Sequence, residues 1–99
     1  MSLATVYLAS FFARDNRGME RAVQVHAVYE GIHGRPPAIF RRYVHRMDDG
    51  QELVACVQRG CYRYMDPLNQ WVGLRSEEAP SGEELRRLRR EKGPRRQFP

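Results

Sequence analysis

Lysine, cysteine and long apolar runs are all scarce in this sequence. Lys92 is the single lysine among 17 basic residues, and the 99 residues include two cysteines, Cys56 and Cys61. No apolar run approaches the roughly 18 residues of a membrane-spanning helix. Two cysteines cannot form the disulfide framework of a small secreted domain. The apolar segment 3–13 lacks the flanks of a signal peptide. We therefore expect a cytoplasmic protein with no membrane partner.

The motifs of common enzyme and metal-binding classes are also missing. The sequence contains no Gly-x-Ser-x-Gly, Walker A or Gly-x-Gly-x-x-Gly pattern. Cys56 and Cys61 form one pair, and His26, His33 and His45 fall in different segments, so four zinc ligands do not converge. We expect no metal, no cofactor and no enzymatic activity. The two cysteines are expected to flank a short hairpin connection as small buried apolar groups. The alternative is a cross-strand disulfide, which requires that the four-residue connection bring their Cα atoms within about 7 Å.

The length and the 41% hydrophobic content predict one small domain. Asp48-Asp49-Gly50-Gln51 separates two apolar segments, and its Asp-Gly pair suits a tight hairpin turn. Asp66-Pro67 is typical of the start of a type I turn. The expected fold is α+β, a small antiparallel β-meander with one or two helices and a basic C-terminal helix. The expected strands are 5–13, 39–47, 52–58, 61–65 and 70–75.

Two periodicities compete over residues 19–32. Ala22, Val25, Tyr29 and Ile32 recur at helical spacing. Alternate residues from Val23 to Tyr29 are equally apolar, and β-branched valines favour a strand. We predict a helix here, with a strand paired to residues 5–13 as the alternative.

A second helix is expected near the C-terminus. Ser81 followed by Glu84 forms a capping box, and Gly93-Pro94 provides the stop. Leu85 and Leu88 are its narrow apolar stripe, which either docks on the body or contacts a protein partner. The expected organisation is a compact α+β domain at 1–76, a linker at 77–82, and a basic helix and tail at 83–99.

The positive charge is concentrated in that C-terminal segment. Residues 83–99 contain seven cations and three anions, whereas the first 82 residues are almost neutral. Such a segment attracts polyanions. We predict a non-enzymatic binding module for nucleic acid or a nucleoprotein complex, of the kind found among phage or mobile-element regulators and inhibitors of host machinery. The predicted contact residues are Arg86, Arg87, Arg89, Arg90, Lys92, Arg95, Arg96, Arg42, Arg46 and Arg63.

Arginine and tyrosine alternate in the expected meander, as in Phe40-Arg41-Arg42-Tyr43 and Tyr62-Arg63-Tyr64. Nucleic-acid-binding sheets combine such residues for stacking and phosphate contact. Strand parity, however, divides the arginines and aromatics of these two segments between opposite faces. An alternative function is a protein-interaction or assembly module that acts as a homodimer, because the low apolar content favours burial of a sheet face or edge by a second copy.

An enzymatic alternative comes from a resemblance. The stretch from Tyr43 to Tyr64, with Asp48-Asp49-Gly50 between apolar strands, resembles the C-terminal sheet of RelE-like ribosome-dependent ribonuclease toxins. That resemblance implies general acid-base and phosphate-stabilising roles for His45, Arg63 and Tyr64. It requires the three side chains to meet in one open cleft.

Overall fold

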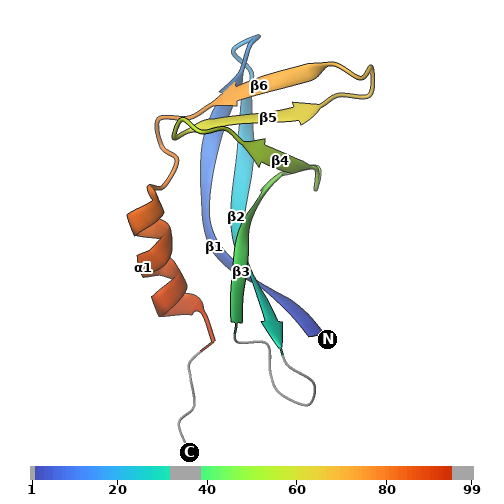
Figure 1. Cartoon of the computed structure of the whole chain (residues 1–99). Coiled ribbons are helices and arrows are strands. Elements are labelled where there is room, and N and C mark those ends of the chain that lie inside the picture. The colour runs from blue at the N-terminus through green and yellow to red at the C-terminus, as the bar shows by residue number, and fades with distance from the viewer. Residues whose placement is uncertain (1, 32–38, 95–99) are drawn as a thin grey trace, which may run out of the picture.

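The computed structural model describes residues 2–31 and 39–94, which form a closed six-stranded antiparallel barrel and one helix (Figure 1). Each strand pairs with the next, and β1 closes the barrel against β6 through Arg14↔Arg75 and Asp15↔Leu74. The predicted α+β class is wrong, since the described chain is mostly β with one short helix. The elements are β1 (Ser2–Asp15), β2 (Glu20–Gly31), β3 (Ile39–Met47), β4 (Glu52–Ala55), β5 (Cys61–Met65), β6 (Trp71–Arg75) and α1 (Gly82–Lys92).

Strands β1 and β2 form a long hairpin, so the helix predicted over 19–32 is wrong wherever the chain is described, and Ile32 lies outside the described residues. Val23, Val25 and Ala27 are fully buried, while Gln24 between them is exposed. This period of two prevails because one face of β2 packs into the core, where β-branched side chains fit well. The hairpin turn is closed by the Asp15 carboxylate, which accepts hydrogen bonds from the backbone amides of Arg17 and Met19 at 2.9 Å.

The predicted meander is present from β3 to β6, with shorter strands than expected. The hairpin around Asp48-Asp49-Gly50 is confirmed, and Gly50 has the positive φ of 87° that such a turn requires. Strand β4 ends at Ala55 rather than at residue 58, and β6 begins at Trp71. At the β5–β6 turn, the Asp66 carboxylate accepts from the amides of Leu68 and Gln70. Figure 1 shows β5 and β6 crossing over one end of the long β1–β2 hairpin.

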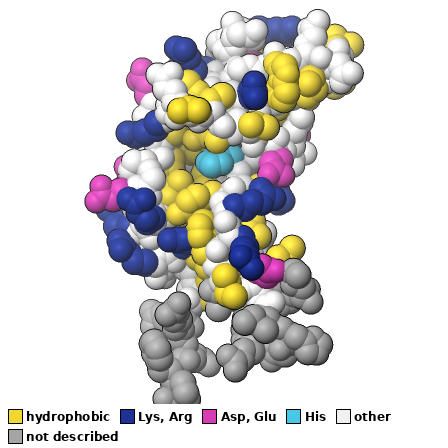
Figure 2. All heavy atoms as spheres, viewed as in Figure 1, with side chains coloured by type: hydrophobic (Ala, Val, Ile, Leu, Met, Phe, Trp, Pro, Cys, Tyr) yellow, Lys and Arg dark blue, Asp and Glu magenta, His cyan; other side chains and the backbone are white. Residues whose placement is uncertain are grey.

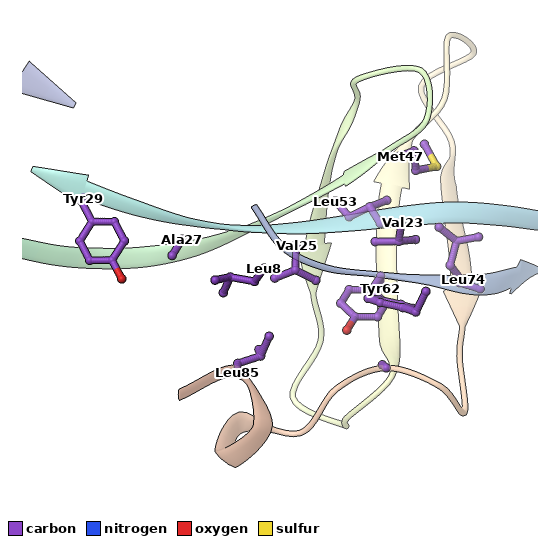
Figure 3. Close-up of a cluster of buried hydrophobic side chains, with 13 residues drawn as sticks. Leu8, Val23, Val25, Ala27, Tyr29, Met47, Leu53, Tyr62, Leu74 and Leu85 are labelled. Atoms are coloured by element: carbon purple, nitrogen blue, oxygen red, sulfur yellow. The ribbon is translucent and has the colours of Figure 1, made fainter. Parts of the chain in front are cut away.

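The core lies between the inner faces of the strands and is closed on one side by α1 (Figure 3). Leu8, Val25 and Leu74 have at most 1% of their surface exposed. Tyr62 and His45 pack inside with ring centroids 4.9 Å apart. Burial of this continuous apolar surface provides the main stabilisation of the fold. The cluster comprises Leu8, Phe11, Ala13, Val23, Val25, Ala27, Tyr29, Met47, Leu53, Tyr62, Leu74, Ala79 and Leu85.

Helix α1 begins at the predicted cap. The Ser81 hydroxyl accepts a hydrogen bond from the Glu84 amide at 3.1 Å, which satisfies a free backbone donor of the first turn. Leu85 is buried and points toward Leu8 and Val25 (Figure 3), while Leu88 is half-buried against the same cluster. The two leucines are therefore occupied by packing against the barrel. Within the predicted linker 77–82, Ala79 is also buried.

A β-bulge in β1 gives α1 a second attachment. The register against β2 shifts between Tyr7 and Ala9, which leaves Leu8 as the extra residue. Its backbone carbonyl accepts a hydrogen bond from the Lys92 ammonium at 2.7 Å. A side chain from the last turn of α1 thus satisfies a carbonyl group at the bulge.

Candidate nucleic-acid interface

The outer surface of β4, β5 and β6 carries a cationic and aromatic face that we call the Trp71 face. Tyr62 and Leu74 are opposite each other and buried, so their neighbours in sequence point outward. Across β5 and β6, the outward pairs are Cys61–Arg75, Arg63–Gly73 and Met65–Trp71, and Arg14 of β1 extends the first row beyond Arg75. The Trp71 face consists of Arg14, Val54, Cys56, Cys61, Arg63, Met65, Trp71, Gly73 and Arg75.

The central contact of this face is a stack of Arg63 on Trp71. The guanidinium carbon lies 4.6 Å from the indole centroid, which is a cation–π distance. Trp71 is diagonal to Arg63 in the sheet, and the residue directly opposite Arg63 is Gly73. Arg63 therefore reaches the indole diagonally across the two strands. Trp71 remains 54% exposed, so much of its ring is accessible to a ligand.

A hollow of about 780 Å³ opens between this stack and the seam where β1 meets β6. Its lining includes Gly73, Arg63 and Trp71 from the stack, together with Arg14 and Arg75 from the seam. A Cβ atom at Gly73 would meet no other atom within 4 Å, so the surface above this residue is open. The hollow is large enough for a planar ring and is bordered by three guanidinium groups.

The three guanidiniums have no acidic partner in the described part of the chain, since Arg14, Arg63 and Arg75 form none of its ion pairs. Asp15 also lines the hollow, but one of its oxygens accepts the two amides of the β1–β2 turn. Unpaired guanidiniums beside a half-exposed aromatic ring attract phosphate and carboxylate groups. The Trp71 face can therefore hold an anionic ligand that carries a ring.

A second hollow of about 580 Å³ continues from the seam on the other side of Arg14 and Arg75. It is bordered by acidic side chains as well as basic ones, among them Glu77 and Glu78. Glu78 approaches β1, where its carboxylate accepts a hydrogen bond from the Phe12 amide at 3.3 Å. The surface suited to an anion therefore ends at the seam.

The cations predicted on α1 divide into two groups. Arg86, Arg87 and Arg90 are exposed. Arg89 instead stacks on Phe40 at 3.8 Å, and Lys92 binds the Leu8 carbonyl, so both hold the helix against the sheet. The predicted contact residues Arg95 and Arg96 lie outside the described residues.

The other predicted cations lie on separate surfaces. Arg42 of β3 is paired with Glu52 at 2.8 Å, and Arg46 is exposed on the same strand. Only Arg63, of the predicted contact residues that the structure describes, belongs to the Trp71 face. Figure 2 shows Lys and Arg side chains in several separate places on the face in view. The structure does not gather the predicted residues into one site.

The three residues implied by the ribonuclease resemblance are not brought together. His45 and Tyr64 point toward the interior, whereas Arg63 points outward from β5 between two inward tyrosines. Burial lowers the pKa of His45 and raises that of Tyr62, which it contacts. The acid-base and phosphate-binding groups of the implied cleft therefore face opposite sides of the strand.

The two cysteines depart from expectation. Cys56 is exposed and Cys61 is half-buried, so neither is the buried apolar group that was predicted, and both thiols are free. Both line the hollow of the Trp71 face.

Of the members of the face, only Arg63 was predicted as a contact residue, and Trp71, Gly73, Arg75 and Arg14 are among those that the sequence analysis missed. Pairing the two predicted strands 61–65 and 70–75 across the Asp66 turn would have placed Arg63 near Gly73 and Trp71. No comparable signal was available for Arg14, because its position depends on barrel closure.

The comparisons with known proteins add no assignment: no protein-family model matches the chain, and neither curated proteins nor solved structures give a match. Within residues 2–31 and 39–94, no three His, Cys, Asp or Glu side chains are grouped so as to hold a metal ion. The helix in the same residues is too short and too polar to cross a membrane.

Proposed function

We propose that this chain binds single-stranded nucleic acid through the Trp71 face. The observation that supports this most directly is the stack of Arg63 on a half-exposed Trp71 beside an open glycine surface, with two further unpaired guanidiniums nearby. Single-strand-binding proteins combine aromatic platforms for bases with cations that follow the phosphates. In this proposal a base stacks on the Trp71–Arg63 pair, and Arg14 and Arg75 contact phosphates.

A single strand fits this surface better than a duplex. Bases within a duplex are stacked on one another, so a side chain on the protein surface cannot reach their faces. Trp71 would then contribute nothing, and only the guanidiniums would contact the duplex backbone. We therefore expect tighter binding of single-stranded than of double-stranded DNA of equal length.

The salt dependence should reflect the number of phosphate contacts. Each contact to a single strand contributes a slope of about 0.7 in a plot of log affinity against log salt. The two phosphate contacts of Arg14 and Arg75 thus predict that log affinity falls with log salt with a slope of about 1.4. The double variant Arg14→Gln/Arg75→Gln should bring the slope close to zero.

The test compares that double variant with a matched control, measured by fluorescence anisotropy of a labelled oligodeoxythymidylate. Arg86→Gln/Arg87→Gln removes the same charge from exposed positions of α1. We expect the Arg14/Arg75 variant to lose about tenfold in affinity and the control less than about twofold. An equal or larger loss in the control would move the contact to α1 and contradict the proposal.

A further inference from the structure

We propose that Cys56 and Cys61 form a reactive dithiol that exchanges with anionic small-molecule disulfides and closes to an intramolecular disulfide. The two cysteines lie on the Trp71 face, and their proposed reactivity does not require bound nucleic acid. Its basis is the position of the two cysteines in the β4–β5 hairpin. The paired residues Val54↔Arg63 and Ala55↔Tyr62 place Cys56 opposite Cys61, and the Cys56 amide donates to the Cys61 carbonyl at 2.9 Å.

Directly opposed residues of an antiparallel pair satisfy the distance requirement of a disulfide. Their Cα atoms lie about 4.5–5.5 Å apart and their side chains share one face. Disulfides span Cα separations of about 4.4–6.8 Å. Cys56 and Cys61 therefore need no rearrangement of the backbone in order to react with each other.

The connection between the two cysteines is anchored, which keeps the thiols facing. Gly60 accepts a hydrogen bond from the Ser76 amide at 2.8 Å, and the Arg59 guanidinium donates to the Ala79 carbonyl at 2.9 and 3.2 Å. Both contacts tie the turn to the segment that follows β6. A fixed turn raises the effective concentration of one thiol at the other and favours closure over attack by an outside thiol.

The surroundings select the charge of the reagent. Both cysteines line the hollow that Arg14, Arg63 and Arg75 border, and Cys61 is directly opposite Arg75. Unpaired cations attract an anionic disulfide and repel a cationic one, and salt screens both effects. Oxidised glutathione is therefore the favoured class of reagent, and cystamine is the disfavoured one.

The exchange has two balanced steps. The exposed Cys56, as thiolate, attacks one sulfur of glutathione disulfide, so that a mixed disulfide forms and one glutathione thiolate leaves. The Cys61 thiolate then attacks the Cys56 sulfur and releases the second glutathione. The protein dithiol loses two electrons and two protons, and the glutathione disulfide gains them as two thiols.

The experiment follows the intact mass of the purified chain in oxidised glutathione, without nucleic acid. We expect the wild type to lose two hydrogens and remain monomeric, with the disulfide mapped to Cys56–Cys61. Cys61→Ser should stop at a stable single glutathionyl adduct, and Cys56→Ser should react several-fold more slowly because Cys61 is half-buried. A wild type that stays reduced, keeps the adduct or forms disulfide-linked dimers would overturn the proposal.

The charge preference is tested separately with the Arg14→Gln/Arg75→Gln variant. We expect the rate ratio of glutathione disulfide to cystamine to fall several-fold in this variant and also at high salt. An unchanged ratio would refute the electrostatic selection. Because the readout is a mass and no nucleic acid is present, failure of this proposal is distinguishable from failure of the proposed function.

Discussion

At the scale of single residues, two glycines with nearly the same φ angle are required for different reasons. Gly18 has φ = 78° and Gly60 has φ = 79°. A Cβ atom at Gly18 would meet nothing within 4 Å, whereas one at Gly60 would lie 2.2 Å from the Ser76 carbonyl oxygen. Gly18 is needed because its position has a positive φ. Gly60 is needed for the same reason and, in addition, because the backbone after β6 passes against it.

This difference predicts unequal costs for the same substitution. Gly18→Ala should lower the free energy of unfolding by about 1–2 kcal/mol, the cost of a left-handed alanine. Gly60→Ala should cost about 3 kcal/mol or more, because the methyl group also displaces a backbone carbonyl. Urea unfolding of both variants measures the difference. Equal losses would show that the Gly60–Ser76 contact is unimportant.

His45 gives a second prediction at this scale. Burial lowers its pKa below the ordinary value of about 6.5. The unfolded chain therefore binds a proton more readily than the folded one below that pH, so stability is complete above it and is lost as the pH falls toward the folded pKa. We expect the free energy of unfolding to decrease between about pH 7.5 and pH 5.5.

The contribution of His45 is isolated by His45→Gln, which should flatten that dependence. His26 is the comparison, because burial and Arg46 also lower its pKa. It contacts Tyr7 rather than the core residue Tyr62, with ring centroids 5.7 Å apart. If the free energy of unfolding of His45→Gln still decreases as steeply with falling pH as in the wild type, the pH dependence comes from another group.

At the scale of elements, α1 is held against the barrel by apolar packing and by cation–π contacts. Leu85 contributes apolar burial, and Arg89 places its guanidinium 3.8 Å from the Phe40 centroid and 5.9 Å from that of Tyr43. These contacts explain why cations in the last turns of the helix are not all free for a partner. An arginine whose guanidinium lies on an aromatic ring also buries the aliphatic stem of its side chain.

The matched pair Arg89→Ala and Arg90→Ala tests this role. Both remove one arginine from adjacent positions of α1, but Arg90 is exposed. We expect a loss of about 1 kcal/mol in stability for Arg89→Ala and less than about 0.5 kcal/mol for Arg90→Ala. Thermal unfolding measures both, and a larger effect at Arg90 would contradict the assigned roles.

The elements also show which structure could be predicted from sequence. The Ser81 cap was predictable because its partner Glu84 is three residues away, and the Asp48-Asp49-Gly50 turn because its chemistry is local. Strand β2 was not, because Val25 and Tyr29 fit both a helical and an alternating pattern. Packing of β2 between β1 and β3 favours the strand over the helix, and this packing cannot be read from a local sequence pattern.

At the scale of the whole molecule, the candidate site depends on barrel closure. Arg14 and Arg75 are 61 positions apart in sequence and become neighbours only where β1 meets β6. We predicted a cationic contact on the C-terminal segment because the density of charge along a chain can be counted from the sequence. The unpaired cations beside Trp71 could not be found in that way, because their grouping is a product of register.

The most direct test of the central claim uses Trp71 itself. It is the single tryptophan of the chain, so emission excited selectively from tryptophan, without the five tyrosines, reports on the proposed site alone. We expect saturable quenching of this emission by a short oligodeoxythymidylate, and little quenching by inorganic polyphosphate, which offers phosphates without bases. Bound DNA that leaves the Trp71 emission unchanged would contradict it, because the strand would then lie elsewhere on the molecule.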